Sequence, residues 1–143
     1  MPYQVDIEYD LNPKTDSVYT VSSHHRRARG NNDKSVWIIS HDEEVELFIF
    51  SKDSGWIDGN KCYGLKLNGT IVQVVGRNPQ NHNLKIAKFL DASRNNKWHG
   101  FPADPKNKRK DIPSTEILTN WRELNYIGKS QVRKLKQQIV CDL

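Results

Sequence analysis

Residues 97–110 read KWHGFPADPKNKRK and divide the chain into two differently patterned halves. Gly100, Pro102 and Pro105 interrupt regular structure, because proline lacks a backbone N–H and restricts the residue before it. We therefore expect this stretch to be a loop rather than a helix or a central strand. It is unusual in bringing aromatic rings, an imidazole, a carboxylate and a cationic run close together.

The half before this loop is patterned for β-strands. Apolar and polar residues alternate, or short apolar runs end in turn residues, which is typical of strands. Asn68-Gly69 supplies the positive φ angles of a tight hairpin turn. The pattern predicts an N-terminal antiparallel sheet of five to six strands arranged in hairpins, with strands over residues 3–9, 18–22, 36–39, 45–50, 62–67 and 70–75.

Beyond residue 76 the apolar spacing becomes helical. Residues 83–94 form an amphipathic pattern and are expected to be a helix that packs on the sheet. Residues 113–124 and 130–140 predict two more helices, joined by a turn containing Gly128. The fold class is therefore α+β, a single domain over residues 1–143, mainly β in 1–76 and mainly α and basic in 77–143. The last two helices form an αα-hairpin.

Composition excludes several classes of protein. The mean hydropathy is −0.78, and no apolar run reaches the ~20 residues of a membrane span. The start of the chain does not resemble a signal peptide, so we expect a cytoplasmic protein. Cys62 and Cys141 form no cluster typical of zinc, although an exported chain would allow one bridge between them. The motifs of nucleotide-dependent enzymes and common hydrolases are absent from the sequence, and we expect no metal and no cofactor.

Positive charge is concentrated in two parts of the chain. The net charge is +5, but residues 77–143 hold fourteen Lys and Arg against six Asp and Glu. Residues 24–34 hold four Lys and Arg against one Asp. This asymmetry favours a polyanionic partner, because Lys and Arg near phosphates release condensed counterions. The alternative is that these lysine-rich surfaces only keep the protein soluble.

Residues 24–34 begin with two histidines and carry three arginines within four positions. The guanidinium group of arginine binds phosphates through bidentate hydrogen bonds, and imidazoles serve as general acids and bases in reactions of RNA. His24 and His25 would point to opposite faces if they lay on one strand. The segment is therefore either a phosphate-binding or catalytic loop, or an exposed hairpin loop without chemistry.

The stretch at residues 97–110 has three interpretations. In the first, Trp98 and Phe101 pack between the sheet and the helices. In the second, the aromatic residues stack on unpaired bases while the cations that follow bind phosphates. In the third, His99 and Asp104 form an acid and base pair assisted by arginines of the early loop. Spacing alone does not place the two loops on one face.

These observations favour a nucleic-acid-binding protein, with RNA preferred over duplex DNA. A metal-independent, toxin-like ribonuclease is the enzymatic alternative, and a module that inhibits an acidic protein partner is the third; we expect no membrane partner. Candidate catalytic residues are His99, His24, His25 and Asp104. Candidate nucleic-acid-binding residues, including two from the last helix, are Arg26, Arg27, Arg29, Trp98, Lys106, Lys108, Arg109, Lys110, Arg133 and Lys134.

Overall fold

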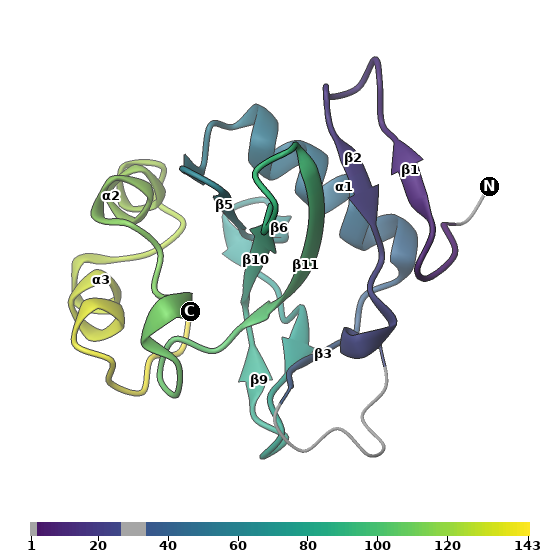
Figure 1. Cartoon of the computed structure of the whole chain (residues 1–143). Coiled ribbons are helices and arrows are strands. Elements are labelled where there is room, and N and C mark those ends of the chain that lie inside the picture. Colours follow the sequence, from purple (N-terminus) through teal and green to yellow (C-terminus); the bar gives the residue numbers. More distant parts are fainter. Residues whose placement is uncertain (1–2, 27–33) are drawn as a thin grey trace.

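A mixed six-stranded sheet lies at the centre of the molecule, with one helix behind it and two helices at its side (Figure 1). The computed structural model describes residues 3–26 and 34–143. The α+β class is confirmed. Among the described residues, no helix is long and apolar enough to cross a membrane.

The strand order of the large sheet is β1-β2-β11-β10-β5-β4, and all its neighbours are antiparallel except β2 and β11, which run parallel. Its strands are β1 (Glu8–Asp10), β2 (Val18–Thr20), β4 (Ile57–Asp58), β5 (Lys61–Gly64), β10 (Ile86–Leu90) and β11 (Lys97–Ala103). The smaller sheets contain β3 (Val36–Trp37), β8 (Gly76–Arg77) and β9 (Asn83–Leu84), and β6 (Leu67–Asn68) with β7 (Ile71–Val72). The helices are α1 (His41–Asp53), α2 (Thr115–Glu123) and α3 (Lys129–Lys136), with short 3-10 turns η1 (Ser23–His25) and η2 (Arg109–Asp111).

The prediction of a loop over residues 97–103 is wrong, because these residues form the central strand β11. Gly100 is needed there for packing: a Cβ at this position would lie 2.4 Å from Cδ1 of Phe89 and 2.6 Å from the hydroxyl of Tyr19. Pro102 lies beyond the two residues that pair with β2, so its missing N–H interrupts no bond to that neighbour. Residues 104–110 do form a turn, which ends in η2.

Two other predicted elements change type. The expected strand at residues 45–50 is part of α1, whose start is fixed by a capping box between Ser40 and Glu43. The expected helix at residues 83–94 is instead β9 and β10. Both faces of β10 are buried, so its apolar residues follow no simple alternation.

Other predictions are confirmed. The first two strands form an antiparallel hairpin. The hairpin of β6 and β7 is also present, but its turn is Gly69-Thr70, one residue later than expected, because Asn68 pairs with Ile71; Gly69 has a φ of +63°. The last two helices pack on each other as an αα-hairpin.

Two apolar clusters hold these elements together. Phe48 of α1 contacts Tyr19, Phe89 and Trp98 on one face of the sheet. A second cluster joins α2 and α3 to the sheet through Trp121, whose ring meets that of Trp56 edge to face at 5.7 Å. The face of the sheet opposite α1 is therefore covered only in part, by η2 and the αα-hairpin.

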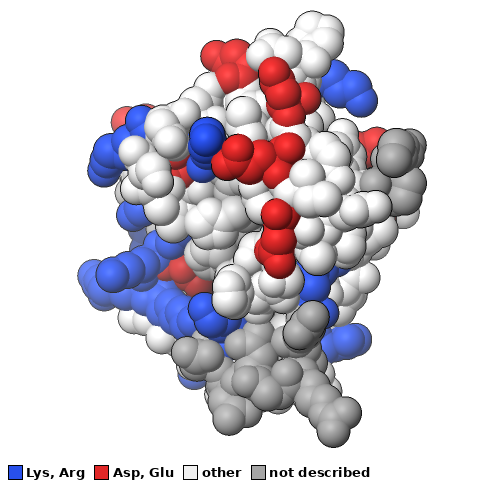
Figure 2. Space-filling view, turned by 45° about the vertical axis from the view of Figure 1, so that its right-hand side comes forward, with Lys and Arg blue, Asp and Glu red and all other residues white. Residues whose placement is uncertain are grey.

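Charge is divided over the surface. Figure 2 shows Asp and Glu across the upper part of one face, and Lys and Arg gathered on one side of the lower part. Strand β1 carries two exposed acids, Glu8 and Asp10, and Glu8 lies 3.4 Å from the ammonium of Lys97.

Candidate nucleic-acid interface

Imidazoles and a phenyl ring meet where η1 lies against the partly covered side of β11. The ring of His25 stacks on that of Phe101, with 5.0 Å between centroids and 23° between planes. His99 lies two residues before Phe101 and therefore points to the same side of the strand. His24 and Lys34 lie near enough to His99 to affect its titration. We name this group, consisting of His24, His25, His99 and Phe101, the histidine face.

The tautomer of His25 follows from its hydrogen bond. Its Nδ1 lies 2.9 Å from the carbonyl oxygen of Ser35, which can only accept, so Nδ1 carries the proton. Burial lowers the pKa of His25 to about 4. The ring is therefore neutral at pH 7 and keeps a lone pair on Nε2.

Burial also lowers the pKa of His99, and the nearby His24 and Lys34 lower it further. A group of imidazoles beside a lysine resists protonation, because each new positive charge repels the others. At neutral pH His25 and His99 therefore present flat, weakly polar rings.

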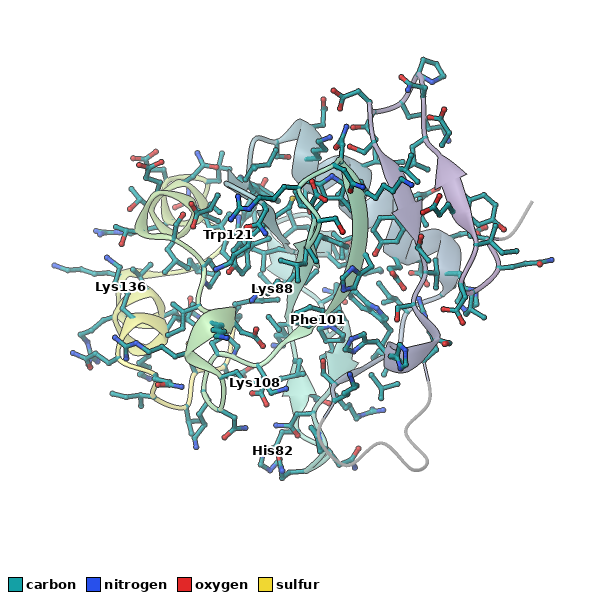
Figure 3. The ribbon with its side chains drawn as sticks, in the orientation of Figure 1. His82, Lys88, Phe101, Lys108, Trp121 and Lys136 are labelled. Carbon is teal, nitrogen blue, oxygen red and sulfur yellow. The ribbon has the colours of Figure 1, made fainter. Side chains whose placement is uncertain are left out.

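Lys88 connects the histidine face to the basic turn at residues 106–110. Its ammonium lies 5.6 Å from the ring centroid of Phe101 and donates to the carbonyl oxygen of Lys110 at 2.7 Å. It also pairs with Asp111 at 3.1 Å. Figure 3 shows Lys88 and Phe101 near each other at the centre of the molecule. Lys88 is only 4% exposed, so it holds the turn in position and does not present its charge to a ligand.

Buried carboxylates hold the basic turn in place. Asp111 accepts from the backbone N–H of Asp104 at 2.9 Å, and Asp104 accepts from the amides of Asn78 and Asn107. These contacts account for the turn geometry without any ligand. We name the exposed residues that it carries the cationic turn, which consists of Lys106, Asn107, Lys108, Arg109 and Lys110.

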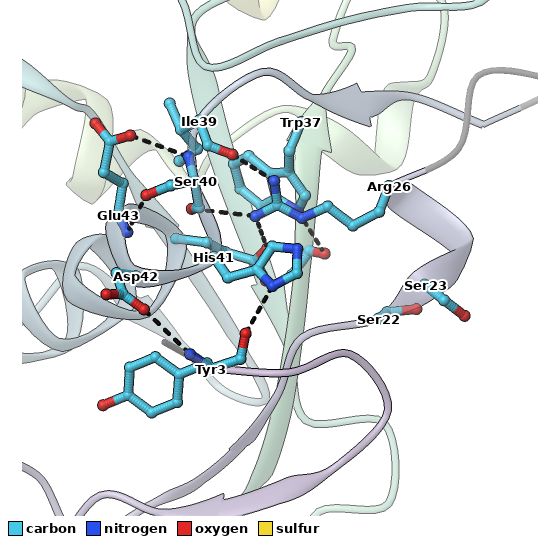
Figure 4. A network of polar contacts seen from close by, with 12 residues as sticks. Tyr3, Ser22, Ser23, Arg26, Trp37, Ile39, Ser40, His41, Asp42 and Glu43 are labelled. Carbon is cyan, nitrogen blue, oxygen red and sulfur yellow. Dashed lines mark hydrogen bonds and ion pairs between the residues drawn. The ribbon is translucent and has the colours of Figure 1, made fainter. Parts of the chain in front are cut away.

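Arg26 does not serve as a phosphate ligand, because its guanidinium points inward. It donates to the carbonyl oxygens of Ile39 and Ser40 and pairs with Glu44 at 2.6 Å (Figure 4). Glu44 is fully buried and also accepts from the hydroxyl of Tyr19. The predicted ligands Arg27 and Arg29 lie outside the described residues.

Several predicted residues are not brought to the histidine face. Asp104 lies five residues after His99, just beyond the end of β11, which is roughly 16 Å for extended chain. Its side-chain partners are amides, so the two residues form no acid and base pair. Trp98 is buried against Phe48 and cannot stack on a base, which confirms the packing interpretation for this residue. Arg133 and Lys134 lie on α3, which Figure 1 shows on the other side of η2 from β11.

Sequence reasoning missed Lys88, which lies within residues 83–94, the segment expected to be a helix. The usable signal was a lysine inside the buried run IAKFL, since a buried lysine needs a partner. Among the described residues, no group of three His, Cys, Asp or Glu is arranged to hold a metal ion. Cys62 and Cys141 are both free thiols.

Comparison of the chain with protein-family models, with curated proteins and with solved structures finds no match.

Proposed function

We propose that this protein binds single-stranded RNA through the histidine face and the cationic turn. The observation that carries the proposal is the stacked pair of His25 and Phe101, joined through Lys88 to the cationic turn. Proteins that bind single strands combine aromatic rings, on which bases stack, with cations that follow the phosphates.

The geometry suits an unpaired strand better than a duplex. A partly exposed ring on the surface of a sheet offers a flat platform to a base that has left its stack, whereas bases inside a duplex are covered by their neighbours. The αα-hairpin supplies no recognition helix next to this platform, because it packs on the sheet through Trp121. Four exposed cations of the cationic turn stand beside the platform, where the backbone of a bound strand would run.

Binding of a fluorescein-labelled RNA of twelve nucleotides, followed by anisotropy, tests the proposal. Phe101→Leu keeps an apolar side chain but removes the ring, and should weaken binding about tenfold. Phe50→Leu is the matched control, because Phe50 is 44% exposed on α1 at a distance from the histidine face. The affinity should fall with salt, and a duplex of the same length should bind more weakly. Equal affinities of both variants and the wild type would contradict the proposal.

A second candidate function is metal-independent RNA cleavage, favoured by the convergence of imidazoles at this face. Nε2 of His25 accepts the proton of a ribose 2′-OH, and the 2′-oxygen forms a bond to phosphorus as the bond from phosphorus to the 5′-oxygen breaks. His99, as an imidazolium, returns a proton to that 5′-oxygen. The products are a 2′,3′-cyclic phosphate and a 5′-hydroxyl.

Cleavage can be separated from binding. The lowered pKa values of His25 and His99 place any activity of this kind at acidic pH. Cleavage of labelled RNA in EDTA at pH 5, lost in His99→Gln while binding persists, would support the enzyme. Intact RNA at every pH between 4.5 and 8 would leave binding as the function.

A further inference from the structure

A second feature lies away from the histidine face, between the β9–β10 connection, the start of the cationic turn and the C-terminal segment. It is a cavity of about 330 Å³. This volume is within the range of pockets that hold small organic molecules. None of the contacts described for the nucleic-acid interface requires this space to be open.

The floor and one wall of the cavity are apolar. Leu84, Ile86, Ala103 and Leu135 form this surface, and Ile139 stands beside it with 46% of its area exposed. Filling the cavity with an apolar group would remove these side chains from water, which is favourable.

The charged residues of the wall differ in whether they already have partners. Lys85 pairs with Asp142 at 2.9 Å, and Asp104 accepts from the amides of Asn78 and Asn107. Lys106 is exposed and makes no ion pair with any residue of segments 3–26 and 34–143. The positive charge still available to a ligand is therefore the ammonium of Lys106.

We propose that this cavity binds a small amphipathic anion, an organic molecule with an apolar body and one carboxylate, sulfonate or phosphate group. The apolar body lies on Leu84, Ile86 and Leu135, and the anionic group faces the ammonium of Lys106. The cavity shares Lys106 with the cationic turn, but its apolar wall belongs to no part of the proposed RNA interface, so ligand binding here can be tested without nucleic acid.

The thiol of Cys141 can report whether this cavity is occupied. Cys141 lines the wall and is half-buried, with its Sγ 3.7 Å from the carbonyl oxygen of Gln131. Cys62 is fully buried, and burial raises its pKa to about 12, so it does not react in the folded protein. A thiol reagent therefore reads the accessibility of the cavity through Cys141 alone.

The test uses the fluorescent anion 1-anilinonaphthalene-8-sulfonate on the wild-type protein. It should bind at one site per chain, and at ten times its dissociation constant it should slow the reaction of Cys141 with Ellman's reagent about tenfold. Lys106→Gln should weaken binding about fivefold, whereas Lys129→Gln, an exposed lysine on α3, should not change it. Ile139→Trp should block binding by filling the opening.

Three results would overturn the proposal. The first is an unchanged rate at Cys141 when the dye is saturating. The second is equal affinity of the uncharged relative N-phenyl-1-naphthylamine, because it would show that no cation recognises the ligand. The third is wild-type affinity in Ile139→Trp.

Discussion

The imidazole of His25 lies flat on the ring of Phe101, with 5.0 Å between the ring centroids. This contact joins η1, which comes early in the chain, to the central strand of the sheet. It also protects His25 from protonation, because a buried imidazolium would lose its hydration. The stability of the fold should therefore depend on the charge state of this ring.

His25 should make the folded state less stable in acid. The unfolded ring takes up a proton below about pH 6.5 and the folded ring only near pH 4, so unfolding binds a proton between these values and stability falls as the pH falls. The cost by pH 4.5 is on the order of 2 kcal/mol, reduced from the full shift because the ring is partly exposed. Urea unfolding of the wild type and His25→Gln at pH 7 and 4.5 measures it. The wild type should lose more stability than the variant over this interval, whereas parallel losses would show that His25 is not the group responsible.

Arg26→Met should destabilise the protein, by an amount that depends on pH. Burial raises the pKa of Glu44 to about 7, even though Tyr19 and Arg26 both favour its charged form. Because this folded pKa is raised, the Glu44 contribution to wild-type stability declines as the pH rises from about 4.5 to 7. Removing Arg26 makes the charged carboxylate still less favourable, so the loss should be about 3 kcal/mol at pH 8 and smaller at pH 5. Chemical denaturation at both values tests this, and a larger loss at pH 5 would contradict it.

Lys88→Met should destabilise the protein and weaken RNA binding together. The substitution leaves the carboxylate of Asp111, which is 3% exposed, without its cation, at a cost of about 3 kcal/mol. It also removes the hydrogen bond that Lys88 donates to the carbonyl oxygen of Lys110, one of the contacts that hold the cationic turn to the sheet. Lys85→Met is the matched control, because its partner Asp142 is exposed and the pair contributes less than about 1 kcal/mol. Equal melting temperatures for the two variants would show that Lys88 does not anchor the turn.

Gly100→Ala should cost several times more than Gly69→Ala. At Gly100 the new Cβ would overlap the ring of Phe89, so the sheet must shift, with a loss of about 3 kcal/mol. At Gly69 there is open space, and only the positive φ opposes alanine, at about 1 kcal/mol. Thermal unfolding of both variants compares the two effects. A milder effect at position 100 than at position 69 would argue against the packing of β11 described above.

The sequence predicted correctly those elements that depend on residues close together in the chain. Gly69 marked the hairpin of β6 and β7 because its turn requires positive φ at the glycine, although the turn lies one residue later than expected. The αα-hairpin followed from apolar spacing and the break at Gly128. The α+β class followed from the same signals.

The central strand could not be predicted, because its glycine and proline are explained by distant partners. Gly100 fits between Phe89 and Tyr19, and Pro102 occupies a position that β2 does not reach. The run at 45–50 was read as a strand although the cap at Ser40 specifies a helix.

The candidate site was predicted in part. His24, His25 and His99 were all named from the sequence, and the structure brings them to one face. The inward turn of Arg26 toward Glu44 depends on a contact eighteen residues away, and the bond of Lys88 to the cationic turn spans twenty-two. Neither contact produces a periodic pattern of residues in the sequence.

The most direct test of RNA recognition is to locate the bound strand on the protein. Ultraviolet crosslinking of a single-stranded RNA, followed by mass spectrometry of the crosslinked peptides, reports which side chains touch bases. Crosslinks are expected at Phe101 and His25, and they should disappear when unlabelled RNA competes. Crosslinks confined to α2 and α3, or none at a concentration where RNA binds, would contradict the proposed interface.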